Sequence, residues 1–446
     1  MSKHFRPWNI DQTLLLPPSV QDFVSKDHVS RFIVGLARES LDLGAITGSY
    51  VSGLGQPPFD PRMMVALLLH GYASGLYSSR RIARACCERN DFVMIVALDP
   101  PDFRTISDFR KRHLKALGEL FLQVLKLCET AGLVKLGHVA LDGTKIKANA
   151  SKHKAMSYER MKKREAELKA DVACMLAAAE AADAQEDETF GKDKRGDEMP
   201  DWASDKKKRL AKIQEAMAAL EAEAKLAAEE ERRIEAEKEQ QRNAEGRKKP
   251  GKPAAPPSDQ PDPKAQRNFT DPESRIMKSK EGFVQAYNAQ AAVDADAQII
   301  VAHELTQCGS DHGQLVPLVE AIENNLGRKP QQASADSGYC SEPNLEALVA
   351  RGIDGYVAPG RAKHPAAVNG KAGPLTQLMR KKIDDGGFET PYRLRKQVVE
   401  PVFGQIKEAR GFRQFLLRGV EKVRAEWAMI CTTHNLLKLF VLAKAA

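Results

Sequence analysis

Three acidic residues that lie far apart in the chain each stand beside a short apolar pattern. Asp142 follows the apolar run 139–141, and Asp336 follows the small-residue run 333–335, so both are predicted at the ends of buried strands. Glu400 lies on the flank of an apolar helical stripe. A carboxylate at the end of a core strand is costly unless a cation or hydrogen-bond donors meet it. Asp-Gly is also a common turn pair, so a simple β-turn remains an alternative at Asp142.

Two aspartates at strand ends and a glutamate on a later helix are the ligands that a pair of Mg²⁺ ions about 4 Å apart requires. Such a site leaves room for phosphate oxygens and water beside the ions. No serine or cysteine stands in an acid–base pattern that would indicate covalent catalysis. A fourth aspartate, Asp311, precedes Gln314 by three residues, which favours a helix capping box over a further metal ligand.

At these positions the chain resembles bacterial insertion-sequence transposases with an Asp-Asp-Glu triad. The segments that carry the resemblance are Asp142-Gly-Thr-Lys, Ala335-Asp-Ser-Gly-Tyr and the stretch from Tyr392 through Glu400 to Lys407. The nearest group is the one numbered eleven eighty-two, in the superfamily with a Tyr-Arg-Glu-Lys signature. The resemblance also covers residues 59–113 and 287–301.

One spacing departs from that signature. The family has three residues between its arginine and its glutamate, whereas four separate Arg395 from Glu400. Either Arg395 or Lys396 therefore fills the basic position. Six residues separate Glu400 from Lys407, as the family has, and this spacing puts Lys407 about two helical turns further along the same face.

The resemblance implies a mechanism and partners. Asp142, Asp336 and Glu400 would hold Mg²⁺ or Mn²⁺ and cleave double-stranded DNA at terminal inverted repeats, and the freed 3′ hydroxyl would then attack target DNA. Tyr392, Arg395 or Lys396, and Lys407 would contact phosphates. A homodimer is expected because two ends must be cut together. Two alternatives remain open: a catalytically inactive DNA-binding relative, and a ribonuclease H-like nuclease without strand transfer.

The N-terminal region is predicted to be helical. Pro61 after Asp60 is typical of a helix start, and a second helix over residues 79–89 carries an arginine-studded outer face. This face suggests a helix-turn-helix that reads the terminal repeats, with a helical cap on the catalytic core as the equal alternative. The candidate DNA contacts are Arg80, Arg81 and Arg84.

The order of the predicted elements defines the fold class. A strand, a β-hairpin, a helix, a strand with Asp336, a helix and a further strand are the order of a ribonuclease H-like α/β core with a mixed sheet. Between the two halves of this core, an apolar 3-4 spacing over residues 206–239 and a weaker one over 161–179 predict an antiparallel coiled-coil hairpin. We expect five regions: an N-terminal helical domain (1–135), the core (136–152 and 268–410), the inserted hairpin (153–245), a flexible Pro/Lys linker (246–267) and a C-terminal helical tail (411–446).

Composition and charge agree with a DNA-binding protein. The 446 residues carry a formal charge of +8, and residues 361–424 alone hold 15 Lys/Arg against 6 Asp/Glu. A basic stretch around Glu400 suits a phosphate-rich partner, although a solvated basic surface is the simpler alternative. The seven cysteines show no paired spacing, and the N-terminus lacks a signal-peptide core. We therefore expect a cytoplasmic protein near the nucleoid, without membrane contact.

Overall fold

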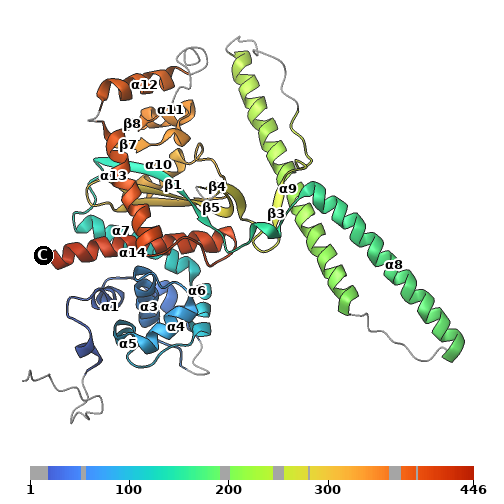
Figure 1. Cartoon of the computed structure of the whole chain (residues 1–446). Helices are drawn as coiled ribbons and strands as arrows, with labels where there is room; N and C mark the ends of the chain where they lie inside the picture. The colour runs from blue at the N-terminus through green and yellow to red at the C-terminus, as the bar shows by residue number, and fades with distance from the viewer. Residues whose placement is uncertain are drawn as a thin grey trace, which may run out of the picture.

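The computed structural model describes residues 19–51, 57–190, 201–244, 256–279, 282–360, 373–387 and 390–445. Within these ranges the chain forms helical and mixed α/β parts that share one continuous hydrophobic core, from which a helical hairpin projects (Figure 1). None of the described helices combines the length and apolar character needed to cross a lipid bilayer.

The central sheet is mixed, as the sequence predicts. Its strands run in the order β4-β5-β1-β7-β8, and β6 pairs with the second half of β5 beside β4. The pairings of β1 with β5, and of β5 with β4 and β6, are antiparallel, whereas β1, β7 and β8 run parallel. The bounds are β1 His138–Lys147, β4 Arg275–Ser279, β5 Gly282–Asp294, β6 Ile300–Thr306, β7 Gln332–Ala335 and β8 Asp354–Val357.

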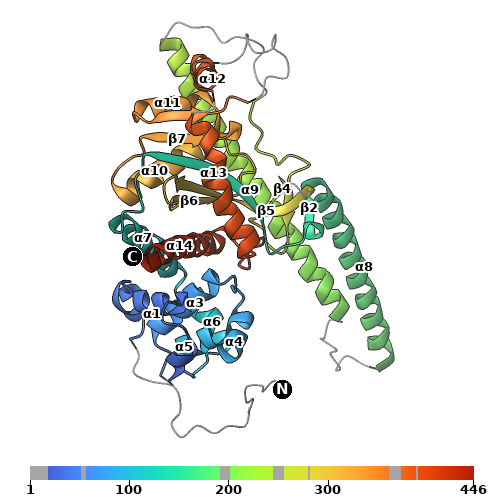
Figure 2. The same cartoon turned by 60° about the vertical axis from the view of Figure 1, so that its left-hand side comes forward.

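Residues 285–294 of β5 are all buried, although alternate side chains point to opposite faces of the sheet. Both faces of the sheet are therefore covered. α13 (Pro391–Gly404) crosses the sheet over β1 and β7, as both views show (Figure 2). α14 (Val420–Ala445) lies between the sheet and the N-terminal helices, where it packs on β6, α7 and α3. The remaining helices around the sheet are α10 Leu315–Leu326, α11 Glu342–Ala350 and α12 Pro374–Gly386.

The N-terminal region is helical, as predicted. Pro61 begins α3, and the Asp60 side chain accepts a hydrogen bond from the Arg62 amide at that end. His113 separates two further helices, α6 and α7. The elements are η1 Val20–Phe23, α1 Val29–Glu39, α2 Gly44–Thr47, α3 Pro61–Ala73, α4 Ser79–Glu88, α5 Asn90–Val96, α6 Phe103–Arg112 and α7 Leu114–Thr130.

The inserted segment forms two long helices, α8 (Tyr158–Phe190) and α9 (Asp201–Ala244), which project from the sheet (Figure 1). A small apolar cluster separate from the main core holds them together, and it includes Met161 and Leu168 of α8 with Ile213 of α9. The predicted linker lies partly outside the described residues. Its described part returns along α9, where Arg232 binds the Pro257 carbonyl and the Asp259 carboxylate. The short elements nearby are η2 Lys152–Lys154, β2 Ala155–Ser157 and β3 Gln266–Asn268.

Candidate active site

Asp142 lies in the middle of a long strand. β1 pairs with β5 from Val139 to Lys147 without a break, so the strand end predicted at Asp142 is wrong, and so is its alternative, a β-turn at Asp142-Gly143. The parallel pairing of β1 with β7 ends at Ala140, so Asp142 has no β7 residue paired with it. Gly143 is required here, because a Cβ at this position would lie 2.2 Å from Gln290 Nε2.

Asp336 follows β7 directly, at the strand end that the sequence predicts. It caps the short helix η3 (Ser337–Tyr339) by accepting a hydrogen bond from the Gly338 amide at 2.8 Å. Ala140 pairs with Ser334, and each aspartate comes two residues later in the sequence than its paired residue. The parallel register therefore places Asp142 and Asp336 side by side at the carboxyl end of β7.

Burial and charge act in opposite directions on Asp142. Its side chain is 19% exposed, and burial is the largest cause that raises its pKa, to about 6. The neighbouring Asp336 carboxylate adds to this rise, whereas the Arg395 guanidinium lowers the pKa. The two carboxylates are thus close enough to disfavour simultaneous ionisation unless positive charge is added.

Arg395 supplies the nearest positive charge. Its Nη1 lies 2.9 Å from Asp142 Oδ2, and the arginine side chain is only 8% exposed. Lys396, the other candidate for the basic position, is exposed on the outer face of α13. Arg395 is therefore the residue of the pair that touches the site, and the extra residue in the spacing moves the basic group one position back along the helix.

Glu400 lies on the helix that covers the two aspartates, but its own side chain is exposed. Arg395, before Glu400 in the sequence, binds Asp142. Lys407, after Glu400, binds Thr144 Oγ1 through its Nζ and, at 3.2 Å, the Lys145 carbonyl. α13 therefore packs against the part of β1 that contains Asp142. In the described parts of the chain, no three His, Cys, Asp or Glu side chains are grouped closely enough to hold a metal ion, so Glu400 does not converge with the two aspartates.

The helix that carries Glu400 passes through Pro401 without ending. A proline inside a helix leaves the carbonyl four residues earlier without its usual donor. Here that carbonyl belongs to Gln397, and the Gln298 side chain donates to it at 3.1 Å. After Gly404 the chain continues as one π-helical turn, η5 (Gln405–Ala409), which contains Lys407.

Asp311 is a site residue that the capping-box prediction misplaced. α10 begins after Gln314, and the Asp311 side chain instead accepts hydrogen bonds from Asn288 at 2.6 Å, Gln290 at 2.8 Å and Lys145 at 3.1 Å. A Cβ at Gly143 would lie 2.8 Å from Asp311 Oδ1. The capping prediction is wrong because these partners come from distant strands.

The sequence held one signal for this network. Asn288 and Gln290 alternate with alanines along an otherwise apolar strand, and polar residues two apart on a strand share a face. Gln290 Oε1 also accepts a hydrogen bond from the Tyr339 hydroxyl, which follows Asp336 by three residues. The network therefore joins β1, β5 and η3 beneath the two aspartates.

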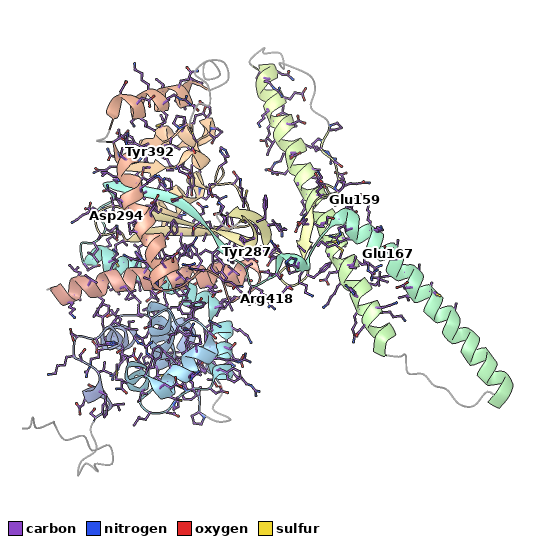
Figure 3. The ribbon with its side chains drawn as sticks, in the orientation of Figure 1. Glu159, Glu167, Tyr287, Asp294, Tyr392 and Arg418 are labelled. Carbon is purple, nitrogen blue, oxygen red and sulfur yellow. The ribbon has the colours of Figure 1, made fainter. Side chains whose placement is uncertain are left out.

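The other predicted contacts lie apart from one another. Tyr392 is half-buried in the first turn of α13, at the end of that helix away from α14 (Figure 3). Arg80, Arg81 and Arg84 are exposed on α4 of the N-terminal region, and Arg84 pairs with Glu88 at 2.7 Å. These arginines form no part of the aspartate cluster.

Two family models match the chain. Residues 18–112 match a family described as transposase domain (DUF772), and residues 361–440 match one described as transposase DDE domain. The second match contains Arg395, Glu400 and Lys407, whereas neither match reaches Asp142 or Asp336. Comparisons with curated proteins and with solved structures gave no match. In these two segments the chain is therefore similar to transposase domains.

Proposed function

We propose that this protein cleaves DNA at the ends of an insertion sequence and joins those ends to target DNA. The observation that carries the proposal is that Asp142 and Asp336 lie next to each other at the carboxyl end of β7, beneath α13. α13 itself lies within the segment that matches the transposase DDE domain. The chain thus has a paired-carboxylate site in a transposase context.

The sheet topology supports a ribonuclease H-like core. In the order β6-β5-β1-β7-β8, the first three strands are joined by antiparallel pairings and the last three by parallel ones. This is the arrangement expected for that fold from the order of elements in the sequence. It places one aspartate on the central strand and the other on the neighbouring parallel strand.

The donor atoms fit a divalent cation. Asp142 and Asp336 offer hard carboxylate oxygens side by side, and burial, with a smaller contribution from the Asp336 carboxylate, raises the pKa of Asp142 although Arg395 lowers it. We propose that these two residues hold Mg²⁺ or Mn²⁺. Glu400 is exposed on α13 and does not converge with them in this structure, so it would have to move towards the two aspartates to act as the third ligand. When bound, such ions polarise the phosphate and lower the pKa of the attacking water.

The residues of the chain position the reacting groups. Arg395 fixes the orientation of the Asp142 carboxylate, and the Asp311 network holds the backbone of β1 in place. We propose that Lys407 and Tyr392 contact phosphates of the cleaved strand, and that Lys396 on the exposed face of α13 contacts the duplex. Two copies of the chain would act together, because both ends of the element must be cut.

Asp142→Asn tests the proposal. The amide is a poorer metal ligand than the carboxylate, so cleavage of duplex DNA bearing the terminal inverted repeats should fall by at least about a hundredfold. Glu400→Gln should give a similar loss if Glu400 is the third ligand. Binding of the same duplex should persist, and Asp99→Asn, which changes an exposed aspartate elsewhere, should cut normally.

The products distinguish the alternatives. Undiminished cutting by Asp142→Asn would remove Asp142 from the mechanism. Cleavage of the repeats without any joined product would indicate a nuclease that lacks strand transfer. Binding without cleavage by the unaltered protein, with Mg²⁺ or Mn²⁺ supplied, would indicate an inactive DNA-binding relative.

A further inference from the structure

A hollow apart from the aspartate cluster lies where the N-terminal helices meet the segment before α14. It is lined by the start of α4, by α6 and by Leu416. We call it the basic groove, because its charged lining is mostly positive. The residues that matter for its chemistry are Arg80, Phe103, Arg104, Arg110, Lys111 and Leu416.

Two arginines at the rim of the basic groove, Arg80 and Arg104, form no close ion pair in the described part of the chain, although the Arg104 charge helps to lower the pKa of Asp102. The Phe103 ring lies 5.0 Å from the Arg80 guanidinium and 5.7 Å from that of Arg104. Within the described ranges, neither guanidinium has a carboxylate within 4 Å. A ring face holds a guanidinium by cation–π attraction without cancelling its charge. Both groups therefore remain available to an anion.

The floor of the groove holds a third, fixed cation. Arg110 is 8% exposed, and its Nη atoms donate to the Tyr77 carbonyl at 2.9 Å and to Ser79 Oγ at 3.3 Å. Its Nε atom is buried without a hydrogen-bond partner. The buried Glu426 carboxylate offsets part of this charge, but its own oxygens accept from the amides of residues 416 and 417.

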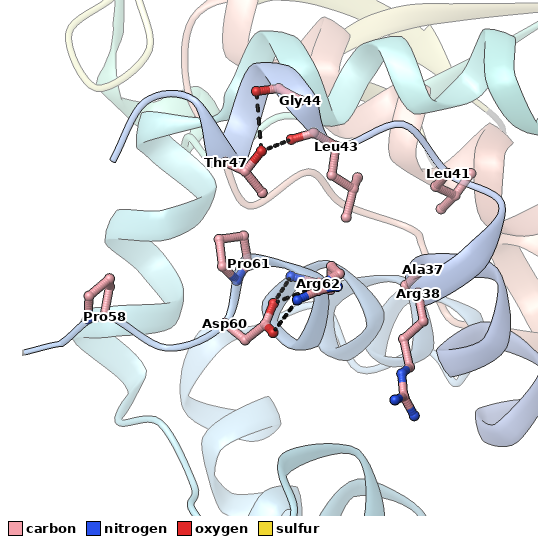
Figure 4. A pocket seen from close by; sticks show the side chains of 10 residues that line it. All are labelled: Ala37, Arg38, Leu41, Leu43, Gly44, Thr47, Pro58, Asp60, Pro61 and Arg62. Atoms are coloured by element: carbon pink, nitrogen blue, oxygen red, sulfur yellow. Dashed lines mark hydrogen bonds and ion pairs between the residues drawn. The ribbon is translucent and has the colours of Figure 1, made fainter. Parts of the chain in front are cut away.

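A hollow elsewhere in the same region provides a contrast. This hollow lies between α1, α2 and the start of α3, and Arg38, Asp60 and Arg62 are among its lining residues (Figure 4). Asp60 and Arg62 form an ion pair at 3.2 Å, so their charges offset each other. Among the described residues that line the basic groove, Asp108 is the only one with a carboxylate; it pairs with Lys111 at 3.2 Å, and three arginines remain.

The basic groove is fixed to the strand that carries Asp142. The Asn149 side chain donates to the Leu416 carbonyl at 2.7 Å, and the Phe415 amide donates to the Lys147 carbonyl at 2.9 Å. Lys147 ends β1 five residues after Asp142. At about 3.4 Å per residue, Lys147 lies roughly 17 Å along the strand from Asp142, and the residues that line the basic groove lie beyond it.

We infer that the basic groove binds backbone phosphates of the same DNA duplex that is cut at Asp142. This inference rests on the proposed function. Successive base pairs rise about 3.4 Å, so the bound phosphates would lie about five or more base pairs from the cleaved bond. The aromatic ring and the fixed guanidinium groups suit phosphate oxygens, which accept several N–H donors at once.

The salt dependence of DNA binding tests the inference. Each phosphate contact contributes about 0.9 to the slope of log K against log salt concentration, so Arg80→Gln/Arg104→Gln should reduce the slope by about 1.8. The full-length protein is titrated against a labelled duplex of fixed arbitrary sequence. Arg38→Gln/Lys126→Gln removes the same charge from exposed sites outside the groove and should leave the slope unchanged.

A third double variant separates the basic groove from the outer face of α4. Arg81→Gln/Arg84→Gln should change the slope less than the groove variant, because Arg84 already pairs with Glu88. Equal slopes for the groove variant and the Arg38/Lys126 control, with duplex binding by the unaltered protein, would overturn the inference alone. A larger effect of the Arg81/Arg84 variant would also overturn it. No duplex binding by the unaltered protein would reject the proposed function as well.

A footprint gives the position of the contact. On duplex DNA carrying the terminal repeat, backbone protection about five or more base pairs from the cleaved bond should weaken in the groove variant. Arg80→Lys/Arg104→Lys keeps the charges and should restore most of the slope, and the circular dichroism spectrum of the glutamine variant should match that of the unaltered protein. Unchanged protection at that position would contradict the inferred geometry.

Discussion

At the scale of single residues, the site is governed by the burial of acidic groups. Asp142 retains one close cation, the Arg395 guanidinium, and one close anion, the Asp336 carboxylate. An arginine suits this place because it stays protonated when buried, whereas a lysine can lose its proton. Asp142 can therefore remain ionised near neutral pH beside a second carboxylate.

Asp311 is predicted to be one of the most costly residues to remove. Asp311→Ala would leave Lys145 with 17% side-chain exposure and no carboxylate, and would free the amide donors of Asn288 and Gln290. Breaking a largely buried pair by removing one partner costs about 3–5 kcal/mol. Urea unfolding should show a loss of that order in the free energy of unfolding.

An exposed ion pair of similar length provides the control. Asp108 and Lys111 lie 3.2 Å apart with 67% and 64% exposed side chains, and Asp108→Ala should cost less than about 1 kcal/mol. Equal losses for the two variants would show that the Asp311 network contributes no more than a surface ion pair.

At the scale of elements, the helical hairpin has its own apolar cluster. Residues of this cluster contact one another across α8 and α9 and are separate from the core beneath the sheet. Elements with separate cores can open without unfolding the rest of a protein. The hairpin is therefore expected to respond to mutation independently of the site.

Leu168→Ala should loosen the hairpin selectively. Leu168 is 1% exposed, and truncating a buried leucine costs about 2–5 kcal/mol. Hydrogen exchange should become faster at the amides of α8 and α9 and stay slow in β1 and β5. Leu226→Ala, at a leucine that is 66% exposed on α9, should change little. Faster exchange throughout the sheet in Leu168→Ala would mean that the hairpin and the core unfold together.

At the scale of the whole molecule, α14 joins the N-terminal helices to the sheet. Asn435 exchanges two hydrogen bonds with the backbone of Ile300, and His434 Nε2 lies 2.9 Å from the Gln298 carbonyl. The predicted C-terminal tail is therefore a central element of the core. Its polar residues are buried and paired with β6 and the residues that precede it.

His434 should make the whole protein less stable in acid. It is 1% exposed, and burial lowers its pKa from an ordinary 6.5 to about 3. Below pH 6.5 His434 binds a proton in the unfolded chain but stays neutral in the folded protein. The free energy of unfolding therefore decreases as the pH falls towards 3. This group alone should lower the free energy of unfolding by about 1.4 kcal/mol per pH unit between those values.

His434→Gln removes that titration. Its free energy of unfolding, measured by urea at a series of pH values, should fall less steeply than that of the unaltered protein, by about the same 1.4 kcal/mol per unit. Parallel curves for the two proteins would show that His434 is protonated to the same extent in both states.

The sequence by itself determined the features that depend on neighbouring residues. The first turn of α3 at Pro61, the two arms of the hairpin and the strand end before Asp336 follow from local propensity and apolar spacing. The mixed sheet also followed from the order of the elements. These predictions held because local and tertiary preferences agree there.

Only the tertiary structure decided the path through Asp142 and the role of Asp311. β5 supplies partners along β1 up to Lys147, and this pairing outweighs the turn propensity of Asp142-Gly143. The Asp311 side chain does not cap a helix but accepts hydrogen bonds from donors on β1 and β5, which are 21 to 166 residues away in the sequence. A buried charge must be paired, and the fold brings these partners together from distant parts of the chain, so the residues next to Asp311 do not predict the contacts.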